Sequence, residues 1–332
     1  MEGVLYLILQ RRGLILLQYM SEGKFTSNEY ASEHVEFMVV VFQTAVRLGL
    51  LYTSEENDEV TMTMPNLIKA KLDEALEHFD RLQGEYRSEL ELWHQMNEVL
   101  IAGVNLYGVM TTFDFNNLLE IRYPEFKSTD LEEMREHYLY LAKYLPVLII
   151  GNSFIFAEKY FIGSSEFIDA EDALDFYKYR ANKIGSVYYE PTKEEIKYYA
   201  NHSFDQESLG YKRLKQEVLK MTEDVDMYMH LIETSIQSGE DISDLLESTA
   251  ELGIIEFQSE EQFIRFMDLY TNLHNNSRLW ENGGFTPSEL IEQVTRKYNL
   301  PDDFLESDLD AGDFESENII SLDAFRREKD KE

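Results

Sequence analysis

The feature that most constrains this fold is a series of short amphipathic segments in the second half of the chain. Between residues 169 and 298, apolar side chains recur every three or four positions, and short polar or glycine-containing turns separate the segments. This spacing puts the apolar side chains on one face of an α-helix. Thr192, Ser259 and Thr286 each precede acidic residues, which is typical of a capped helix N-terminus. The sequence therefore predicts an all-helical domain over residues 163–300.

The first half of the chain presents another order of elements twice. Residues 14–64 read as three helices, the third ending at Gly49, followed by two short strands around a polar turn. Residues 89–162 repeat this order, with an extra short strand after the first helix and a closing hairpin that reverses at Gly151 and Asn152. Three helices followed by a hairpin are the elements of a winged helix.

The predicted fold is therefore mainly α with minor β content. A mostly solvent-exposed helix with a break near Gly84 connects the two winged-helix-like units. Beyond Pro301 the sequence is acidic and lacks apolar periodicity, so we expect a disordered tail. The predicted parts are a winged-helix-like unit at 1–65, the helical connector at 66–88, a second winged-helix-like unit at 89–162, the helical domain at 163–300 and the tail at 301–332.

Net charge limits the classes of partner. The 332 residues include 30 basic and 64 acidic side chains, which gives a formal charge of -34. Such a field repels phosphate backbones and anionic membrane surfaces. The predicted third helix of each winged-helix-like unit begins with carboxylates, including Glu33 and Glu132, and offers few cations for DNA. The composition therefore favours a protein partner and disfavours nucleic acid and membranes.

The residue types also limit the chemistry. The chain has no cysteine, which removes disulfides, thiolate nucleophiles and cysteine-bound metals, and is compatible with a cytoplasmic location. Glu91, His94 and Glu98 share one helix face, but the second Glu-x-x-His motif of a carboxylate-bridged site is missing. No nucleotide-binding or nucleophile motif occurs in the sequence. We therefore predict no catalytic, cofactor-binding or metal-binding residues.

The segment 273–290, LHNNSRLWENGGFTPSEL, combines an asparagine pair, a tryptophan and a Gly-Gly turn. Its asparagines are suited either to bond the last turn of the preceding helix or to cap a new short helix containing Arg278 and Trp280. The glycines permit a left-handed turn before the next helix. Two roles remain open for these residues: contact with a partner, or fixing of the turn. The candidates are Asn275, Asn276, Arg278 and Trp280.

The sequence of this segment resembles the C-terminal part of the proteins in a family from Gram-positive bacteria that has no assigned activity. Members are often recognised by an appended SEC-C zinc motif or by an N-terminal segment like that of the Rho termination factor. Three further stretches resemble the family in the same order: GVNLYGVMTTFDFNNLLE (103–120), YYEPTKEEIKYYA (188–200) and SIQSGEDISDLLESTAELGIIEFQSEEQF (235–263).

Two departures limit what the resemblance implies. The SEC-C motif would follow residue 290 and needs clustered cysteines, which this chain lacks, so no zinc ligand is carried over. The Rho-like segment would lie upstream of residue 14, which already belongs to the first winged-helix-like unit. The resemblance therefore covers the family's central body, roughly residues 14–290, and implies no activity.

The sequence alone does not identify a biochemical activity, and three hypotheses follow from it. The favoured one is a cytoplasmic, non-catalytic protein-interaction or regulatory protein that recruits its partner through an acidic surface. The second is a nucleic-acid-associated regulator that uses its winged helices, which requires a concentrated positive patch. The third is an enzyme whose site is assembled from distant carboxylates and histidines in a deep pocket.

Overall fold

The structure is a computed structural model of the whole chain. It describes residues 17–18, 41–42, 44–56, 59–128, 131–144, 155–158, 161–164, 167, 170–185, 187–251, 253–255 and 257–298. Several sequence predictions lie outside the described residues: most of the first two helices in 14–34, the reversal at Gly151 and Asn152, and the tail at 301–332.

The chain divides into two compact units. The first comprises residues 1–101 and 111–162, and the second comprises residues 102–110 and 163–332. The last two turns of one long helix, α5 (Arg87–Tyr107), therefore belong with the C-terminal helices. The sequence predicted that residues 89–162 form one domain, whereas residues 102–110 belong to the second unit.

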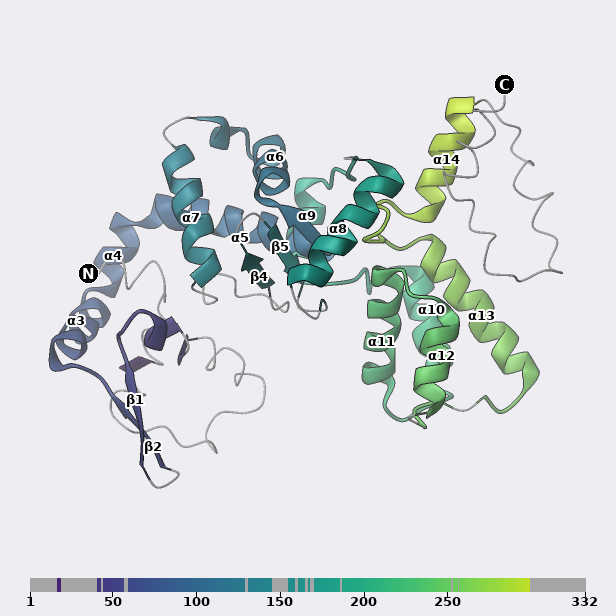
Figure 1. The fold of residues 1–332 in the computed structure, drawn as a ribbon, viewed down its shortest axis with the longest axis horizontal. Helices are drawn as coiled ribbons and strands as arrows, with labels where there is room; N and C mark the ends of the chain where they lie inside the picture. Colours follow the sequence, from purple (N-terminus) through teal and green to yellow (C-terminus); the bar gives the residue numbers. More distant parts are fainter. Residues whose placement is uncertain are drawn as a thin grey trace. The chain divides into compact units, whose positions relative to one another are not determined.

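Apart from α5, the first unit contains a hairpin that is followed along the chain by helices and a short strand (Figure 1). Its elements are β1 (Tyr52–Glu56), β2 (Glu59–Thr63), α3 (Asn66–Glu77), α4 (Phe79–Glu85), α6 (Thr112–Arg122), the 3-10 helix η2 (Pro124–Lys127), α7 (Glu132–Tyr144) and β4 (Ile155–Glu158). Two short strands complete the β structure: β3 (Val109–Thr111) and β5 (Phe161–Ser164). Strands β3, β4 and β5 form one sheet, in the order β3-β5-β4.

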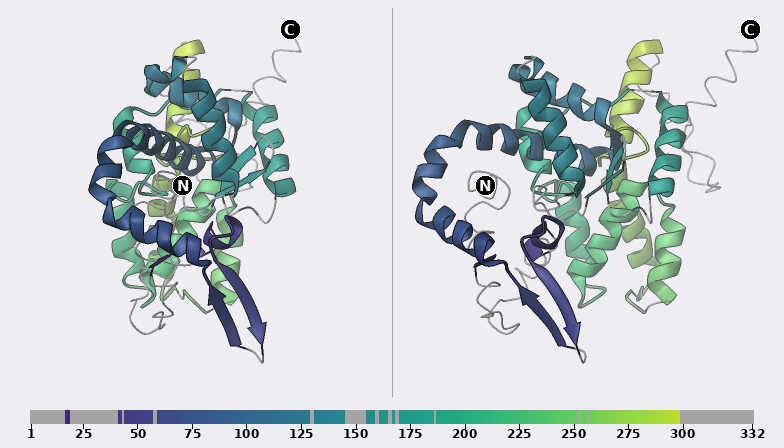
Figure 2. Two further views of the ribbon diagram at one scale, coloured as in Figure 1. Left: turned by 90° about the vertical axis from the view of Figure 1, so that its left-hand side faces the viewer. Right: turned by 60° about the vertical axis from the view of Figure 1, so that its left-hand side comes forward.

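The hairpin predicted around the polar turn is confirmed. Strands β1 and β2 pair antiparallel from Tyr52 opposite Thr63 to Glu56 opposite Glu59, and the ribbon is drawn clearly in both views of Figure 2. The helix before it ends at Gly49, as predicted, where φ is +67° and the amide nitrogen donates to the Val46 carbonyl. Glycine suits this position because a left-handed backbone strains other residues.

The connector is helical and is interrupted near Gly84, as predicted, and also at His78, which was not predicted. The helices α3, α4 and α5 are interrupted at His78 and at Tyr86, while Gly84 lies inside α4. Gly84 is exposed and has φ in the ordinary range, so its backbone does not require glycine. The predicted break near Gly84 corresponds to the interruption at Tyr86, two residues further along the chain.

Packing in the first unit centres on Tyr138 of α7. Its ring stacks on Phe115 with centroids 6.3 Å apart and meets Trp93 edge-on at 6.2 Å. Its hydroxyl donates to Asn97 Oδ1, so the polar end of a fully buried side chain is satisfied. Helix α6 begins at a capping box in which Thr111 and Asp114 bond each other's backbone N–H.

The predicted helical segments of the second half are all present, so the mainly helical prediction is confirmed. They are α8 (Ala170–Ile184), α9 (Lys193–Tyr199), α10 (Leu209–Val218), α11 (Val225–Ser238), α12 (Ile242–Glu251), α13 (Glu260–Asn275) and α14 (Pro287–Tyr298). The predicted caps are confirmed too, because the hydroxyls of Thr192, Ser259 and Thr286 each accept from the backbone three residues on. Within the described residues, no helix has both the length and the apolar character to cross a bilayer.

The core of the second unit lies between four of these helices. Helix α10 packs against α11 and α13, and α11 packs against α12 (Figure 1). The buried apolar side chains come from the helix faces that the three- and four-residue spacing predicts. They include Leu214, Val218, Tyr228, Ile232, Ile236, Leu245, Phe266, Tyr270 and Leu273, and Leu279, which lies beyond the end of α13, packs with them.

Candidate functional site

The asparagine pair closes helix α13. Asn276 Nδ2 donates to the Asn272 carbonyl at 2.8 Å, and Ser277 Oγ donates to the Leu273 carbonyl at 2.7 Å. Asn275 is exposed at the last position of the helix. Of the two predicted roles, bonding to the preceding helix is therefore the one that occurs. The alternative short helix containing Arg278 and Trp280 is not formed, because residues 278 and 279 have no regular structure and turns follow.

Trp280 lies in the interior of the second unit, with 3 % of its surface exposed. Its indole Nε1 donates to the Asn105 carbonyl at 2.9 Å, and its backbone nitrogen donates to the Gln237 carbonyl at 3.0 Å. Its ring packs against Gly108, where a Cβ would fall 2.6 Å from Trp280 Cδ2. Gly108 also has φ of +71°, so both the backbone and the tryptophan require glycine there. Trp280 therefore fixes the 102–110 segment within the unit.

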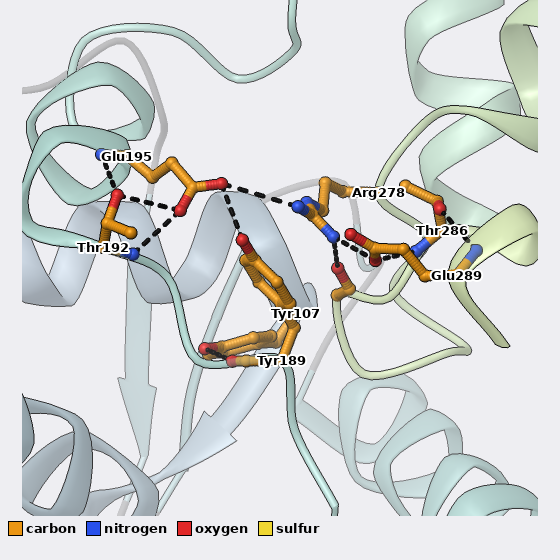
Figure 3. A network of polar contacts seen from close by, with 8 residues as sticks. Tyr107, Tyr189, Thr192, Glu195, Arg278, Thr286 and Glu289 are labelled. Carbon is orange, nitrogen blue, oxygen red and sulfur yellow. Dashed lines mark hydrogen bonds and ion pairs between the residues drawn. The ribbon is translucent and has the colours of Figure 1, made fainter. Parts of the chain in front are cut away.

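Arg278 is held on three sides. Its guanidinium carbon lies 3.5 Å from the centroid of the Tyr189 ring. Nη1 donates to Glu289 and, at 3.2 Å, to the Gly284 carbonyl, while Nη2 is 3.5 Å from Glu195 Oε1. Figure 3 shows these contacts converging on the guanidinium from α9, from the Gly-Gly turn and from α14. A planar guanidinium suits this position because it stacks on a ring and bonds carboxylates at the same time.

Each carboxylate that Arg278 contacts belongs to a helix capping box. Glu195 accepts from the Thr192 backbone nitrogen and hydroxyl at the start of α9. Glu289 accepts from the Thr286 backbone nitrogen at the start of α14, and its own nitrogen donates to Thr286 Oγ1. One guanidinium therefore ties together two helix N-termini that lie far apart in the sequence.

The surroundings of Glu195 and Arg278 favour the charged form of each side chain. Burial alone would raise the pKa of Glu195, but hydrogen bonds from Thr192 and Tyr189, together with the charge of Arg278, hold it below its usual value. Burial would lower the pKa of Arg278, but the charge and hydrogen bond of Glu289, together with Tyr189 and Tyr199, raise it above its usual value. Burial and the hydrogen bond to Glu195 raise the pKa of the Tyr189 hydroxyl to about 12. The tyrosine therefore remains a neutral hydrogen-bond donor.

A second arginine, Arg180 of α8, fixes the 102–110 segment from another side. Its side chain is 1 % exposed, and it donates to the carbonyls of Tyr107 and Val109 and to the Tyr188 hydroxyl. Its guanidinium carbon lies 4.8 Å from the centroid of the Tyr188 ring. Backbone carbonyls and an aromatic face thus replace the water that a buried cation loses.

A pocket of about 500 Å³ opens beside Arg278. This volume falls within the range of small-ligand sites. Of the residues that the sequence singled out, Asn276 and Arg278 line the pocket, whereas Asn275 and Trp280 do not. The lining residues are Glu195, Tyr198, Tyr199, Ser203, Phe204, Asp205, Glu207, Gln237, Asn276, Ser277, Arg278 and Thr286.

Sequence reasoning did not single out most of these lining residues, but the resembling stretches contain several of them. The stretch 188–200 supplies Glu195 and both pocket tyrosines, and 235–263 supplies Gln237. The stretch 103–120 supplies Asn105 and Gly108 beneath Trp280. Residues from all four stretches that carry the resemblance therefore lie close together in the second unit. Their fixed order along the chain gave no indication of this proximity.

The described residues contain no group of three or more histidine, aspartate and glutamate side chains placed to hold a metal ion. Glu91, His94 and Glu98 lie along α5 as predicted. The chemistry that the pocket offers is hydrogen-bond acceptance, negative charge and aromatic contact.

Comparisons of the chain with protein-family models, with curated proteins and with solved structures find no match. The geometry of the chain itself therefore carries the functional argument.

Proposed function

We propose that this chain is a cytoplasmic, non-catalytic protein-interaction or regulatory protein. The observation that carries the proposal is the pocket beside Arg278, whose lining includes three carboxylates and three aromatic side chains. In a chain with a formal charge of -34, this pocket is suited to a partner with basic groups. In this proposal the 273–290 segment supports the pocket beside Arg278, which is the surface that contacts the partner.

The role of each candidate residue follows from its burial. Trp280 is enclosed and Arg278 is bonded on several sides, so both support the surface from within. Asn276 is exposed and lines the pocket, and Asn275 lies next to it on the outside of α13. The two asparagines are therefore the candidates for direct contact with the partner.

Two finer assignments belong to the same proposal. We propose that residues 1–65 and 89–162 are winged-helix-like units that act as scaffolds, supported by the β1–β2 hairpin after the helix that ends at Gly49. We also propose that the chain is a relative of the SEC-C-associated family, supported by the four resembling stretches. Neither assignment adds a zinc site, because the chain lacks cysteine.

Affinity capture tests the proposed function. The tagged full chain is incubated with a lysate of its own organism, with and without nuclease, and bound proteins are identified by mass spectrometry. A protein that stays bound after nuclease treatment, and that an Asn275→Ala/Asn276→Ala variant loses, is the expected result. Recovery that disappears with nuclease would instead support the winged-helix nucleic-acid hypothesis and overturn the proposal.

A further inference from the structure

Not every carboxylate that lines the pocket beside Arg278 is paired with a cation among the described residues. Glu195 is paired with Arg278, and Glu207 is paired with Lys212 at 2.6 Å. Asp205 forms no ion pair with any of the described residues, and its Oδ1 only accepts long hydrogen bonds from the Tyr198 hydroxyl and the Glu207 nitrogen. One carboxylate at the exposed edge of the pocket is therefore left without a cation.

A buried amide gives a second, independent indication. Gln237 is 6 % exposed and lines the pocket. Its Nε2 donates to two backbone carbonyls, those of Asn105 at 3.1 Å and Ser203 at 2.5 Å. Because only the nitrogen of the amide donates, these two carbonyls fix which end of the amide is which.

The amide oxygen of Gln237 is consequently turned away from both carbonyls, and it accepts no hydrogen bond from the residues that the structure describes. This oxygen is not fully enclosed, so it can accept a hydrogen bond from a molecule in the pocket. A ligand that brings N–H groups into the pocket would satisfy this oxygen. A ligand with only acceptors, such as a phosphate or a carboxylate, would not.

Aromatic side chains complete the lining. Tyr198, Tyr199 and Phe204 all line the pocket, and burial raises the pKa of both tyrosine hydroxyls, so the rings carry no charge. A cation near an uncharged aromatic face is attracted to it, and arginine makes such contacts more often than lysine. A carboxylate, a buried acceptor and aromatic walls are together a match for a guanidinium, whose donors point in several directions in one plane.

We propose that this pocket binds an arginine side chain of the protein partner, with donors directed to Gln237 Oε1 and to Asp205. This inference rests on the proposed protein-interaction function and specifies the chemistry of its contact. Arg278 is the resident cation that keeps Glu195 paired, so the incoming guanidinium is directed to the acceptors that remain.

The probe is a pair of short capped peptides, one with a central arginine and one with citrulline. Citrulline has nearly the same shape but no charge, so the pair isolates the contribution of the cation. Binding to the full-length chain is followed by amide chemical shifts in ¹H–¹⁵N spectra. We expect the arginine peptide to bind at least about tenfold more tightly, and to shift the signals of residues 198–205 and of the Gln237 side chain.

The matched variants are Asp205→Asn and Glu223→Gln. The first keeps the Oδ1 acceptor and loses the charge, whereas Glu223 is an exposed carboxylate of the same unit that does not line the pocket. We expect Asp205→Asn to weaken binding of the arginine peptide about tenfold and Glu223→Gln to leave it within about twofold. Equal binding of the two peptides, equal effects of the two variants, or no binding of either peptide would overturn the inference.

The same variants separate this inference from the proposed function. If Asp205→Asn captures the same proteins from lysate as the unaltered chain does, the interaction function stands and the arginine pocket is refuted. If the arginine peptide binds as expected but no protein is captured, the pocket is a cation site and the interaction function is refuted.

Discussion

Gly108 provides the sharpest test of how the second unit is held together. Its φ of +71° lies in the left-handed region, and a Cβ at this position would lie 2.6 Å from Trp280 Cδ2 and 2.7 Å from Cε3. The Gly108→Ala substitution therefore combines a strained backbone with an overlap against a buried ring. The ring has little freedom to move, because its Nε1 is bonded to the Asn105 carbonyl.

The expected cost is the sum of two effects. A left-handed alanine costs about 1–2 kcal/mol. Overlap with a packed ring costs about 1–3 kcal/mol, since either the ring or the 102–110 segment has to shift. We therefore expect Gly108→Ala to lower the free energy of unfolding of the second unit by about 2–5 kcal/mol.

Gly185 is the matched control for the backbone effect. Its φ is +74°, but a Cβ there would meet no atom within 4 Å. Gly185→Ala should thus cost only about 1–2 kcal/mol. The difference between the two variants measures the contact between Gly108 and Trp280.

The assay uses the chain's own tryptophans. Only Trp93 and Trp280 are present, and they belong to different units, so a Trp93→Phe background makes fluorescence report the second unit alone. Urea unfolding then gives the stability of that unit, with the slope m as a check that the variants unfold in the same way. A cost for Gly108→Ala no larger than that for Gly185→Ala would refute the argument that Trp280 requires glycine at this position.

Three further predictions concern charge and helix propensity. Arg278→Ala should destabilise the second unit by about 2 kcal/mol, measured by the same assay, because it leaves Glu195 and Glu289 half-buried without their cation; a cost below about 0.5 kcal/mol would contradict this role. Burial raises the pKa of the Glu233 carboxyl, whose oxygen accepts a hydrogen bond from Tyr211, so the folded state favours the protonated form. The contribution of this pKa shift to the stability of the second unit should therefore be complete below about pH 4.5, and it should disappear as the pH rises through the folded-state pKa. Glu233→Gln should remove the loss of stability above about pH 4.5 from a curve of unfolding free energy against pH. A curve that is the same with and without the substitution would contradict this role of Glu233. Gly84→Ala should raise the helical content or stability of the first unit by about 0.5–1 kcal/mol, measured by circular dichroism, because the exposed site inside α4 has room for a Cβ; destabilisation would show that α4 needs glycine after all.

The elements that the sequence predicted well depend on neighbours a few positions apart. The caps at Thr192, Ser259 and Thr286, the end of a helix at Gly49 and the β1–β2 hairpin all follow from contacts within a few residues. Such local chemistry is readable in one sequence because the spacing itself fixes the geometry. The break near Gly84 was predicted to within two residues, because glycine weakens a helix without requiring it to end at that position.

The sequence by itself thus determined a mainly helical chain, the limits of most of its helices and a strongly negative net charge. Only the tertiary structure decided which residues meet. Arg278 contacts Glu195 across 83 positions, and Trp280 bonds Asn105 across 175. The free oxygen of Gln237 depends on two distant carbonyls in the same way. No periodicity encodes such pairs, because each results from packing several amphipathic helices into one core, where the side chains that meet are set by the fold and not by their spacing.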